Sequence, residues 1–282
     1  MSNLFLFFLL ASTYAQLTFS QDRKIDSLVN VLKTSKDDTN KIASYINLIN
    51  ICRNSNPEMA KEKCDEMLRL SQQLNHPKFI GKSYFQIAIQ NRREGNYEAA
   101  VKNYFSALKI FEEISDSLNI AKVFGSLGIT YWQQGNLPLA LSNYKKSLSL
   151  GEIMHEKLII YSNLNNIGGI FLEQNQPDSA LSYFNLVLKD AVEMNDSSGM
   201  AEVYGNIGDA YYKKNNLPLS LQNYFQSLHI SEKVDNKYTL MTSYGSIGSI
   251  YAAMKEYDKS LAYQLKGIEI ASSLNSKGNL KD

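Results

Sequence analysis

Apolar positions recur along the chain in one frame, with a period of 40 residues. Each unit carries a small residue in a largely apolar segment, at Ala88, Gly128, Gly168, Gly208 and Gly248. A turn residue follows at Gly95, Gly135, Asn175, Asn215 and Lys255, and a second small residue at Ala100, Ala140, Ala180, Ser220 and Ser260. Repetition at a fixed period is typical of solenoid proteins, in which each unit packs on its neighbours.

Within a unit, the apolar spacing is that of α-helices. In the fifth unit, Tyr204, Ile207, Gly208 and Tyr211 share one face, and a KNNLP turn separates them from a second apolar face. Polar hinges near residues 75, 115, 155, 195, 235 and 275 close the units. We therefore expect a helix pair in each unit, with a first helix of about 13 residues and a second of about 17.

The beginning of the array departs from the repeat. Residues 41–80 form a degenerate unit of the repeat, in which Ser44 and Leu48 replace the aromatic and the small residue. Upstream, residues 21–40 predict a capping helix, whose apolar face includes Leu28 and Leu32, and a KDDTN turn that begins the next helix. Five regular units of 40 residues then occupy residues 81–280. No polar capping helix follows them, which favours self-association or a continuing domain at the C-terminus.

Residues 1–20 predict a signal peptide. The run NLFLFFLLA is shorter than the ~20 residues that a membrane-spanning helix needs, and cleavage is expected after Ala15 or Ser20. No Lys or Arg precedes the run, so the alternative is an apolar helix docked on a cytoplasmic protein. We expect export to the bacterial periplasm or cell envelope, and no other segment is apolar enough to span a membrane.

Composition and motifs argue against catalysis. The 29 basic and 28 acidic residues give a net charge of +1, so no general attraction to nucleic acid is expected. The chain has no GxxxxGK[ST] loop, no HExxH and no paired-cysteine metal motif. Its histidines lack a ligand partner at metal spacing: His76, His155 and His229. We therefore expect no enzyme activity, cofactor or metal.

The two cysteines, Cys52 and Cys64, lie on either side of a turn expected near Ser55–Pro57. Their axial offset adds to a helix spacing of ~8–10 Å. The resulting Cα separation exceeds the ~7 Å limit for a disulfide, so both thiols are expected to be free and buried.

The residues of the fifth unit resemble the tetratricopeptide repeat (TPR) signature: Tyr204, then Ile207 and Gly208, then Tyr211, with Ser220 and Tyr224 in the second helix. The usual unit has about 34 residues, and a longer second helix accounts for the difference. The chain is similar to a long-helix subclass that includes LGN-type scaffolds and bacterial peptide-sensing regulators. Its N-terminal layout is similar to the exported TPR segments of bacterial sensor kinases. The resemblance implies an all-α, right-handed superhelix (α-solenoid) of about six helix-turn-helix repeats.

The resemblance also implies that the first helices line a concave groove that binds an extended peptide or a partner protein. In the fifth unit the groove stripe is Glu202, Asn206, Asp209 and Lys213. In LGN-like arrays an asparagine at the column of Asn206 bonds a peptide backbone, because an amide both donates and accepts hydrogen bonds. Two arginines make one end basic, which suits an acidic end of a peptide. The candidate ligand-binding residues are Arg92, Arg93, Trp132, Gln133, Asn166, Glu173, Asn206, Asp209, Tyr212 and Lys213.

Three functions remain open at this stage. The first is a non-catalytic, exported scaffold that holds a peptide or partner protein and acts in protein interaction or signalling. The second is the sensory segment of a two-component histidine kinase or a transcription regulator. The third is a cytoplasmic receptor for a quorum peptide, which requires the N-terminus to remain uncleaved.

Overall fold

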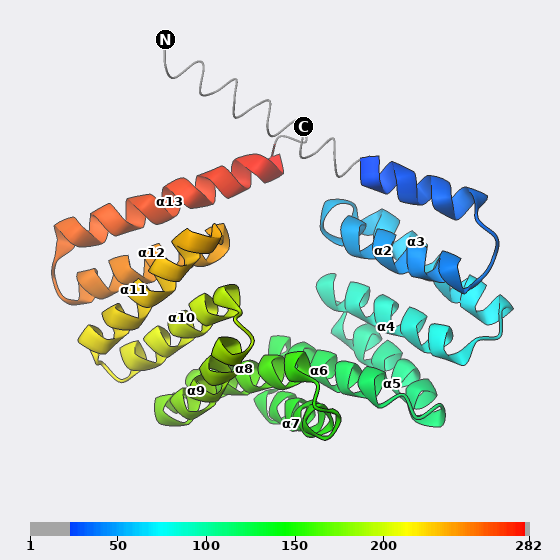
Figure 1. Cartoon of the computed structure of the whole chain (residues 1–282), viewed down its shortest axis with the longest axis horizontal. Helices are drawn as coiled ribbons and strands as arrows, with labels where there is room; N and C mark the ends of the chain where they lie inside the picture. The colour runs from blue at the N-terminus through cyan, green and yellow to red at the C-terminus, as the bar shows by residue number, and fades with distance from the viewer. Residues whose placement is uncertain (1–22, 280–282) are drawn as a thin grey trace, which may run out of the picture. The chain divides into compact units, whose positions relative to one another are not determined.

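The computed structural model describes residues 23–279, and side chains up to residue 274. This part of the chain consists of helices and tight turns and contains no strand, which confirms the predicted all-α solenoid of helix-turn-helix repeats (Figure 1). Residues 23–34 are helical, and the labelled helices that follow are α2 (Thr39–Ser55), α3 (Pro57–Gln73), α4 (Pro77–Arg93), α5 (Tyr97–Glu113), α6 (Ser117–Gln133), α7 (Leu137–Met154), α8 (Lys157–Glu173), α9 (Pro177–Glu193), α10 (Ser197–Lys213), α11 (Leu217–Val234), α12 (Lys237–Ala253) and α13 (Tyr257–Asn279).

The expected length of the first helices is wrong. The regular first helices, such as α6 and α10, have 17 residues rather than about 13, as many as the second helices α5 and α9. The difference arises at the hinges, which are shorter than their polar sequences suggest. Asp116 and Asp196 cap the next helix, each accepting a hydrogen bond from the backbone N–H three residues on, so helix resumes immediately.

Every 20 residues along the chain, a helix ends at a residue in the left-handed backbone conformation. Glycine fills this position at Gly95 and Gly135, where φ is 78° and 74°. Non-glycine residues with positive φ occupy the other turns, at Asn75, Ser115, His155, Asn195, Asn175, Asn215, Asp235 and Lys255. At several turns the next residue's N–H reaches back to a carbonyl five residues earlier, as from Asn96 to Asn91 O at 2.9 Å. This bond pattern satisfies carbonyls at the helix end and reverses the chain.

Small residues let the two helices of a pair approach each other. A β-carbon added at Gly128 would lie 2.6 Å from the Tyr144 ring, and one at Gly208 would lie 2.7 Å from the Tyr224 ring. Tyr144 and Tyr224 are 0% and 4% exposed. The repeating small residue is therefore a packing position that receives the aromatic ring of the second helix.

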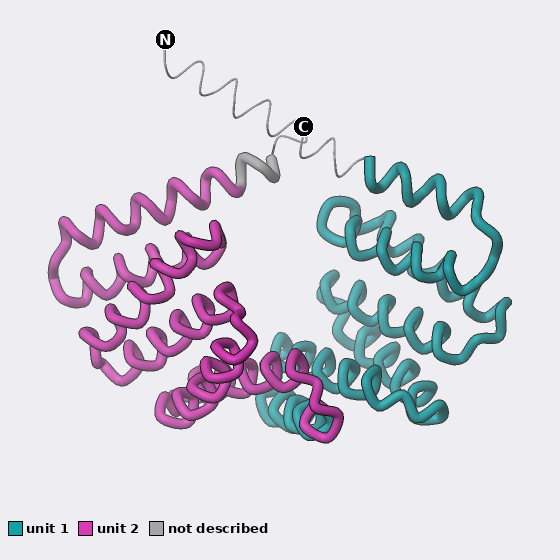
Figure 2. Tube along the Cα trace, viewed as in Figure 1, with its two compact units in different colours: residues 1–150 teal, residues 151–282 magenta. Residues whose placement is uncertain are grey.

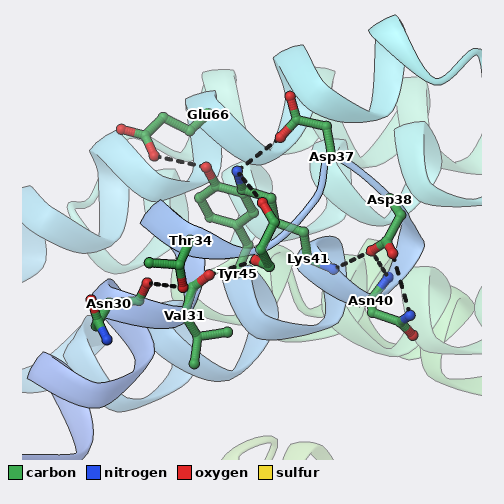
Figure 3. Close-up of polar contacts among 10 residues, drawn as sticks. Asn30, Val31, Thr34, Asp37, Asp38, Asn40, Lys41, Tyr45 and Glu66 are labelled. Carbon is green, nitrogen blue, oxygen red and sulfur yellow. Dashed lines mark hydrogen bonds and ion pairs between the residues drawn. The ribbon is translucent and has the colours of Figure 1, made fainter.

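The start of the array is fixed by polar contacts around α2 (Figure 3). The Asp38 carboxylate accepts from the backbone N–H groups of Asn40 and Lys41 at 2.8 and 3.0 Å, which caps α2 within the predicted KDDTN turn. The Tyr45 hydroxyl donates to Glu66 at 3.0 Å and joins α2 to α3. The helix at residues 23–34 contributes Leu32, 7% exposed, to the core of these two helices.

The chain divides into two compact units, unit 1 (residues 1–150) and unit 2 (residues 151–282) (Figure 2). In unit 1, α2 to α6 pack in succession, and the first helix α4 also contacts the first helices α2 and α6. In unit 2, α8 to α13 do the same, and α10 contacts both α8 and α12. The proposed signal peptide at residues 1–20 lies outside the described residues. Cys52 and Cys64 are buried and free, as expected.

Candidate binding site

The predicted groove stripe of the fifth unit lines a cavity in unit 2. Glu202, Asn206 and Asp209 of α10 form one wall of this cavity, whose volume is about 320 Å³. Their spacing of four and three residues places them on one face of the helix. Lys213, one turn further on, is exposed and does not line the cavity.

Hydroxyl side chains of α12 form the facing wall: Thr239, Thr242, Ser243 and Ser246. The hydroxyls of Ser243 and Ser227 lie 2.9 Å apart and bond each other, which ties α12 to α11. Tyr238 also lines the cavity and is 68% exposed. The cavity therefore has one wall of carboxylates and an amide, and another of neutral hydroxyls.

The core of the repeat supports Asp209. Because Gly208 has no side chain, the Tyr224 ring packs against it, and the Tyr224 hydroxyl donates to the Asp209 carboxylate. Ser220, in the second small column, donates to the carbonyl of Gly208 at 2.8 Å. The same small and aromatic residues that build the core thus hold one acidic side chain of the cavity in place.

Both carboxylates of the cavity are shifted toward their neutral form. Burial raises the pKa of Glu202, and the negative charge of Asp196 raises it further. Burial also raises the pKa of Asp209, against the opposing effects of the Tyr224 hydrogen bond and the charge of Lys213. The Asp209 residue is exposed to solvent, so its carboxylate is only partly desolvated by the surrounding protein.

Asn206 forms a hydrogen bond to the preceding repeat. Its side-chain N–H donates to Asn165 Oδ1 at 2.8 Å, and Asn165 lines the cavity. The 40-residue spacing places Asn166 in the column of Asn206, and Asn166 is half-buried on α8 and does not line this cavity. Its neighbour Asn165 is the asparagine that bonds to Asn206.

The basic end of the predicted groove lies in unit 1, where its side chains bond to one another. Arg92 donates to the Gln133 side-chain oxygen at 3.1 Å, which connects α4 to α6. Arg93 donates to Asn54 and connects α4 to α2. Gln86, in the column of Asn206, is 8% exposed and accepts from Arg53.

The remaining candidates lie apart from the unit 2 cavity. Trp132 is half-buried on α6 and packs edge-on against Tyr144, with ring centroids 6.4 Å apart. Glu173 is exposed at the end of α8, and Tyr212 is exposed near the end of α10. Of the ten candidates, the structure brings Asn206 and Asp209 together in one cavity. The ten candidates include none of the α12 hydroxyl residues, although Thr242 and Ser246 lie 40 residues after Glu202 and Asn206 and so belong to the same stripe of the repeat.

Other kinds of site are not evident in the described part of the chain. No group of three or more His, Cys, Asp or Glu residues there could hold a metal ion. No helix in the same residues is both long and apolar enough to cross a membrane.

A comparison with protein-family models identifies the repeat in two parts of the chain. Models described as tetratricopeptide repeat match residues 79–152 and residues 242–274. A comparison with curated protein sequences gave no significant match.

Solved structures are similar to the chain over most of its length. BtubC (BKLC) from P. vanneervenii is 18% identical with a TM-score of 0.68, over 78% of this chain and 93% of that one. A Rap protein complexed with Competence and Sporulation Factor is 14% identical with a TM-score of 0.61, over 91% and 77%. A signal transduction ATPase with a tetratricopeptide repeat sensor from Pyrococcus horikoshii is 14% identical with a TM-score of 0.68, over 92% of this chain and 41% of that one. At these identities the likeness shows the fold.

Proposed function

Because the chain is a tetratricopeptide repeat protein, we propose that it is a non-catalytic scaffold that binds an extended peptide, or an extended segment of a partner protein, along the first helices of unit 2. One observation carries this proposal. The polar stripe of α10 lines a cavity, with Glu202, Asn206 and Asp209 in its wall. Polar groups that converge on a concave surface are typical of ligand sites.

The chemistry of the cavity fits a peptide better than a reacting substrate. The Asn206 amide keeps a second N–H and its oxygen for a peptide backbone, and the Thr242 hydroxyl, which donates to the Thr239 carbonyl at 3.0 Å, can accept from a backbone N–H. The Rap protein of similar fold was crystallised with Competence and Sporulation Factor, which supports a bound partner for this kind of array.

Selection of binding peptides would test the proposal. A phage-displayed library of random peptides is panned on the full chain, and selected peptides are synthesised and measured by fluorescence anisotropy. We expect the double variant Glu202→Ala/Asn206→Ala to bind about tenfold more weakly, which corresponds to ~1.4 kcal/mol.

The matched control removes the same residue types from α9, as Asn185→Ala/Glu193→Ala, both exposed and outside the cavity. This control should bind like the wild type. Peptides that bind both variants equally well would place the binding surface elsewhere and contradict the proposal.

We also propose that the protein is exported and acts in signalling, on the strength of the apolar run NLFLFFLLA near the N-terminus. Mass spectrometry of the protein purified from its native cell should give a mature N-terminus at residue 16 or 21, after Ala15 or Ser20. An N-terminus that begins at Met1 would instead favour the cytoplasmic peptide receptor. A kinase or regulator domain encoded in frame after Asp282 would favour the sensory segment.

A contact of α13 with a second copy of the chain is part of the same proposal. Tyr257, Leu261, Leu265 and Ile268 form a stripe on α13 and are 67%, 57%, 55% and 60% exposed. Forty residues earlier, Leu221 and Phe225 of α11 pack into the core with the following helix pair. Sedimentation velocity should therefore detect a dimer that Leu261→Glu/Leu265→Glu dissociates, and a monomeric wild type at high concentration would refute the contact.

A further inference from the structure

The charged residues that line the unit 2 cavity are all of one sign. Glu202 and Asp209 are seven residues apart on α10, which separates them by about 10 Å along the helix axis. Among the described residues, those that line the cavity include no Lys, Arg or His. The charged residue that acts most strongly on Glu202 is another carboxylate, Asp196, and it raises the pKa of Glu202.

A buried hydroxyl in the cavity wall is also without a partner. Thr239 is 4% exposed and lines the cavity, and its Oγ1 has no hydrogen bond within the described part of the chain. An unpaired buried polar group costs free energy that a ligand donor could recover. The hydroxyl of Ser243, one turn further on, is already bonded to Ser227 and offers no such vacancy.

We propose that this cavity is a specificity site for a cationic group, a guanidinium or an alkylammonium, presented by the peptide ligand; this inference rests on the proposed function. Such groups have only N–H donors, which the two carboxylates and the Thr239 hydroxyl can accept. The exposed ring of Tyr238 provides an aromatic face against which the cation can lie. A volume of about 320 Å³ suits one side chain rather than a folded surface.

The geometry favours a peptide side chain over a free polyamine as the source of the cation. Asn206 lies between the two carboxylates in the sequence of α10 and lines the same cavity, so an amide is available to the backbone next to a bound basic side chain. A free polyamine could donate to the amide oxygen but has no carbonyl to accept from the amide N–H, whereas a peptide backbone can do both.

Binding of short blocked peptides to the full chain tests the inference. The probes are Ala-Ala-Arg-Ala-Ala, the same peptide with lysine, and the same peptide with citrulline, the neutral analogue of arginine. Isothermal titration calorimetry should show the arginine peptide binding at least about tenfold more tightly than the citrulline peptide, the size expected for one charge-assisted contact. Argininamide and spermidine are titrated alongside as free cations.

Two matched variants locate the effect. Glu202→Gln/Asp209→Asn removes both charges but keeps the shape, and circular dichroism checks that it is folded. It should abolish the preference for arginine over citrulline. Asp258→Asn/Glu269→Gln removes the same number of charges from exposed positions on α13 and should leave the preference unchanged.

The outcomes separate this inference from the function on which it rests. Equal binding of the arginine and citrulline peptides would overturn the cation site and leave the peptide-binding function standing. Absence of binding by every cation would likewise overturn the cation site, while library peptides that still bind would uphold the function. Spermidine and argininamide binding as tightly as the peptides, and sensitive to the same double variant, would support a cation site but contradict a peptide as its source.

Discussion

The first helices of the two units differ in whether their charges are already partnered. In unit 1, Arg53 and Arg92 donate to side-chain oxygens of the next repeat, those of Gln86 and Gln133. In unit 2, Glu202 lines an open cavity, and its strongest charged influence is of the same sign. A long arginine side chain spans the distance between repeats, whereas the short acidic and hydroxyl side chains leave a space. The same face of a repeat can therefore either join neighbouring repeats or remain available to a ligand.

The largest effect should come from the residue that supports the cavity. Gly208→Ala places a β-carbon 2.7 Å from the Tyr224 ring, so the ring must move and its bond to Asp209 is lost. We expect a loss of about 1–3 kcal/mol in the free energy of unfolding, measured by urea denaturation followed by circular dichroism.

Gly205→Ala, on the same helix, is the control for that substitution. Its nearest heavy atom would be 3.7 Å away, so stability should be equal or higher by up to ~1 kcal/mol from helix propensity. A Gly208→Ala protein as stable as Gly205→Ala would mean that the ring is not held by this packing.

The next largest loss of stability should come from breaking the hydrogen bonds that arginines form between repeats in unit 1. Arg53→Met leaves the Gln86 side-chain oxygen without its donor on a residue that is 8% exposed. The expected cost is about 1–3 kcal/mol, because an unpaired buried acceptor loses its solvation without compensation. Arg92→Met, whose bond to Gln133 is exposed, should cost about 1 kcal/mol or less in the same denaturation experiment. Equal losses of unfolding free energy in the two variants would show that burial does not set the contribution of these two arginine hydrogen bonds.

Neutralising the two carboxylates of the unit 2 cavity should increase the stability of the protein slightly. Both carboxylates have a folded pKa above the ordinary values of 3.8 for Asp209 and 4.5 for Glu202. The folded state therefore holds more protons than the unfolded chain between the ordinary and the raised values, and stability falls as pH rises through that interval.

Glu202→Gln/Asp209→Asn removes this loss, so its Tm at neutral pH should exceed the wild-type value by about 1–3 °C. The difference should vanish below the ordinary carboxyl pKa values. A variant that is less stable at neutral pH would mean that the carboxylates are already stabilised by a cation within the protein.

The smallest effect should come from supplying unit 2 with a cation of its own. Thr242→Lys places an ammonium group in the wall facing Glu202 and Asp209. The pKa of both carboxylates should fall, and stability should rise by about 0.5 kcal/mol, since the pair is largely exposed. Carboxyl titration by NMR measures the pKa change, with Ser249→Lys on the exposed part of α12 as the control. Unchanged pKa values in Thr242→Lys would show that the two walls do not face each other closely enough to interact.

Much of the fold could be predicted because it depends on local signals that repeat. The turn residues from Asn75 to Lys255 were evident from their regular spacing, and at most of these positions the residue is Gly or Asn, which a left-handed helix end favours. The small column at Gly208 and its aromatic partner at Tyr224 were evident from their spacing, and the structure joins them directly. The length of the first helices was not predicted, because capping residues such as Asp196 look like loop in a sequence but begin a helix immediately.

The binding surface was predicted only in part. Glu202, Asn206 and Asp209 share one helix face, and the 3.6-residue period of a helix is enough to identify such a set. Asn165 and Thr239 meet them from α8 and α12, and no period within one helix specifies how neighbouring helices are aligned.

The sequence by itself determined the repeat, its helical pairs, the turn positions and the polar character of the first helices, because each follows from spacing along one chain segment. Tertiary structure alone decided which polar side chains bond to neighbouring helices and which remain available to a ligand. That outcome depends on whether Arg92 reaches Gln133 and whether Glu202 reaches any cation, and such distances are set by the packing of helices far apart in sequence.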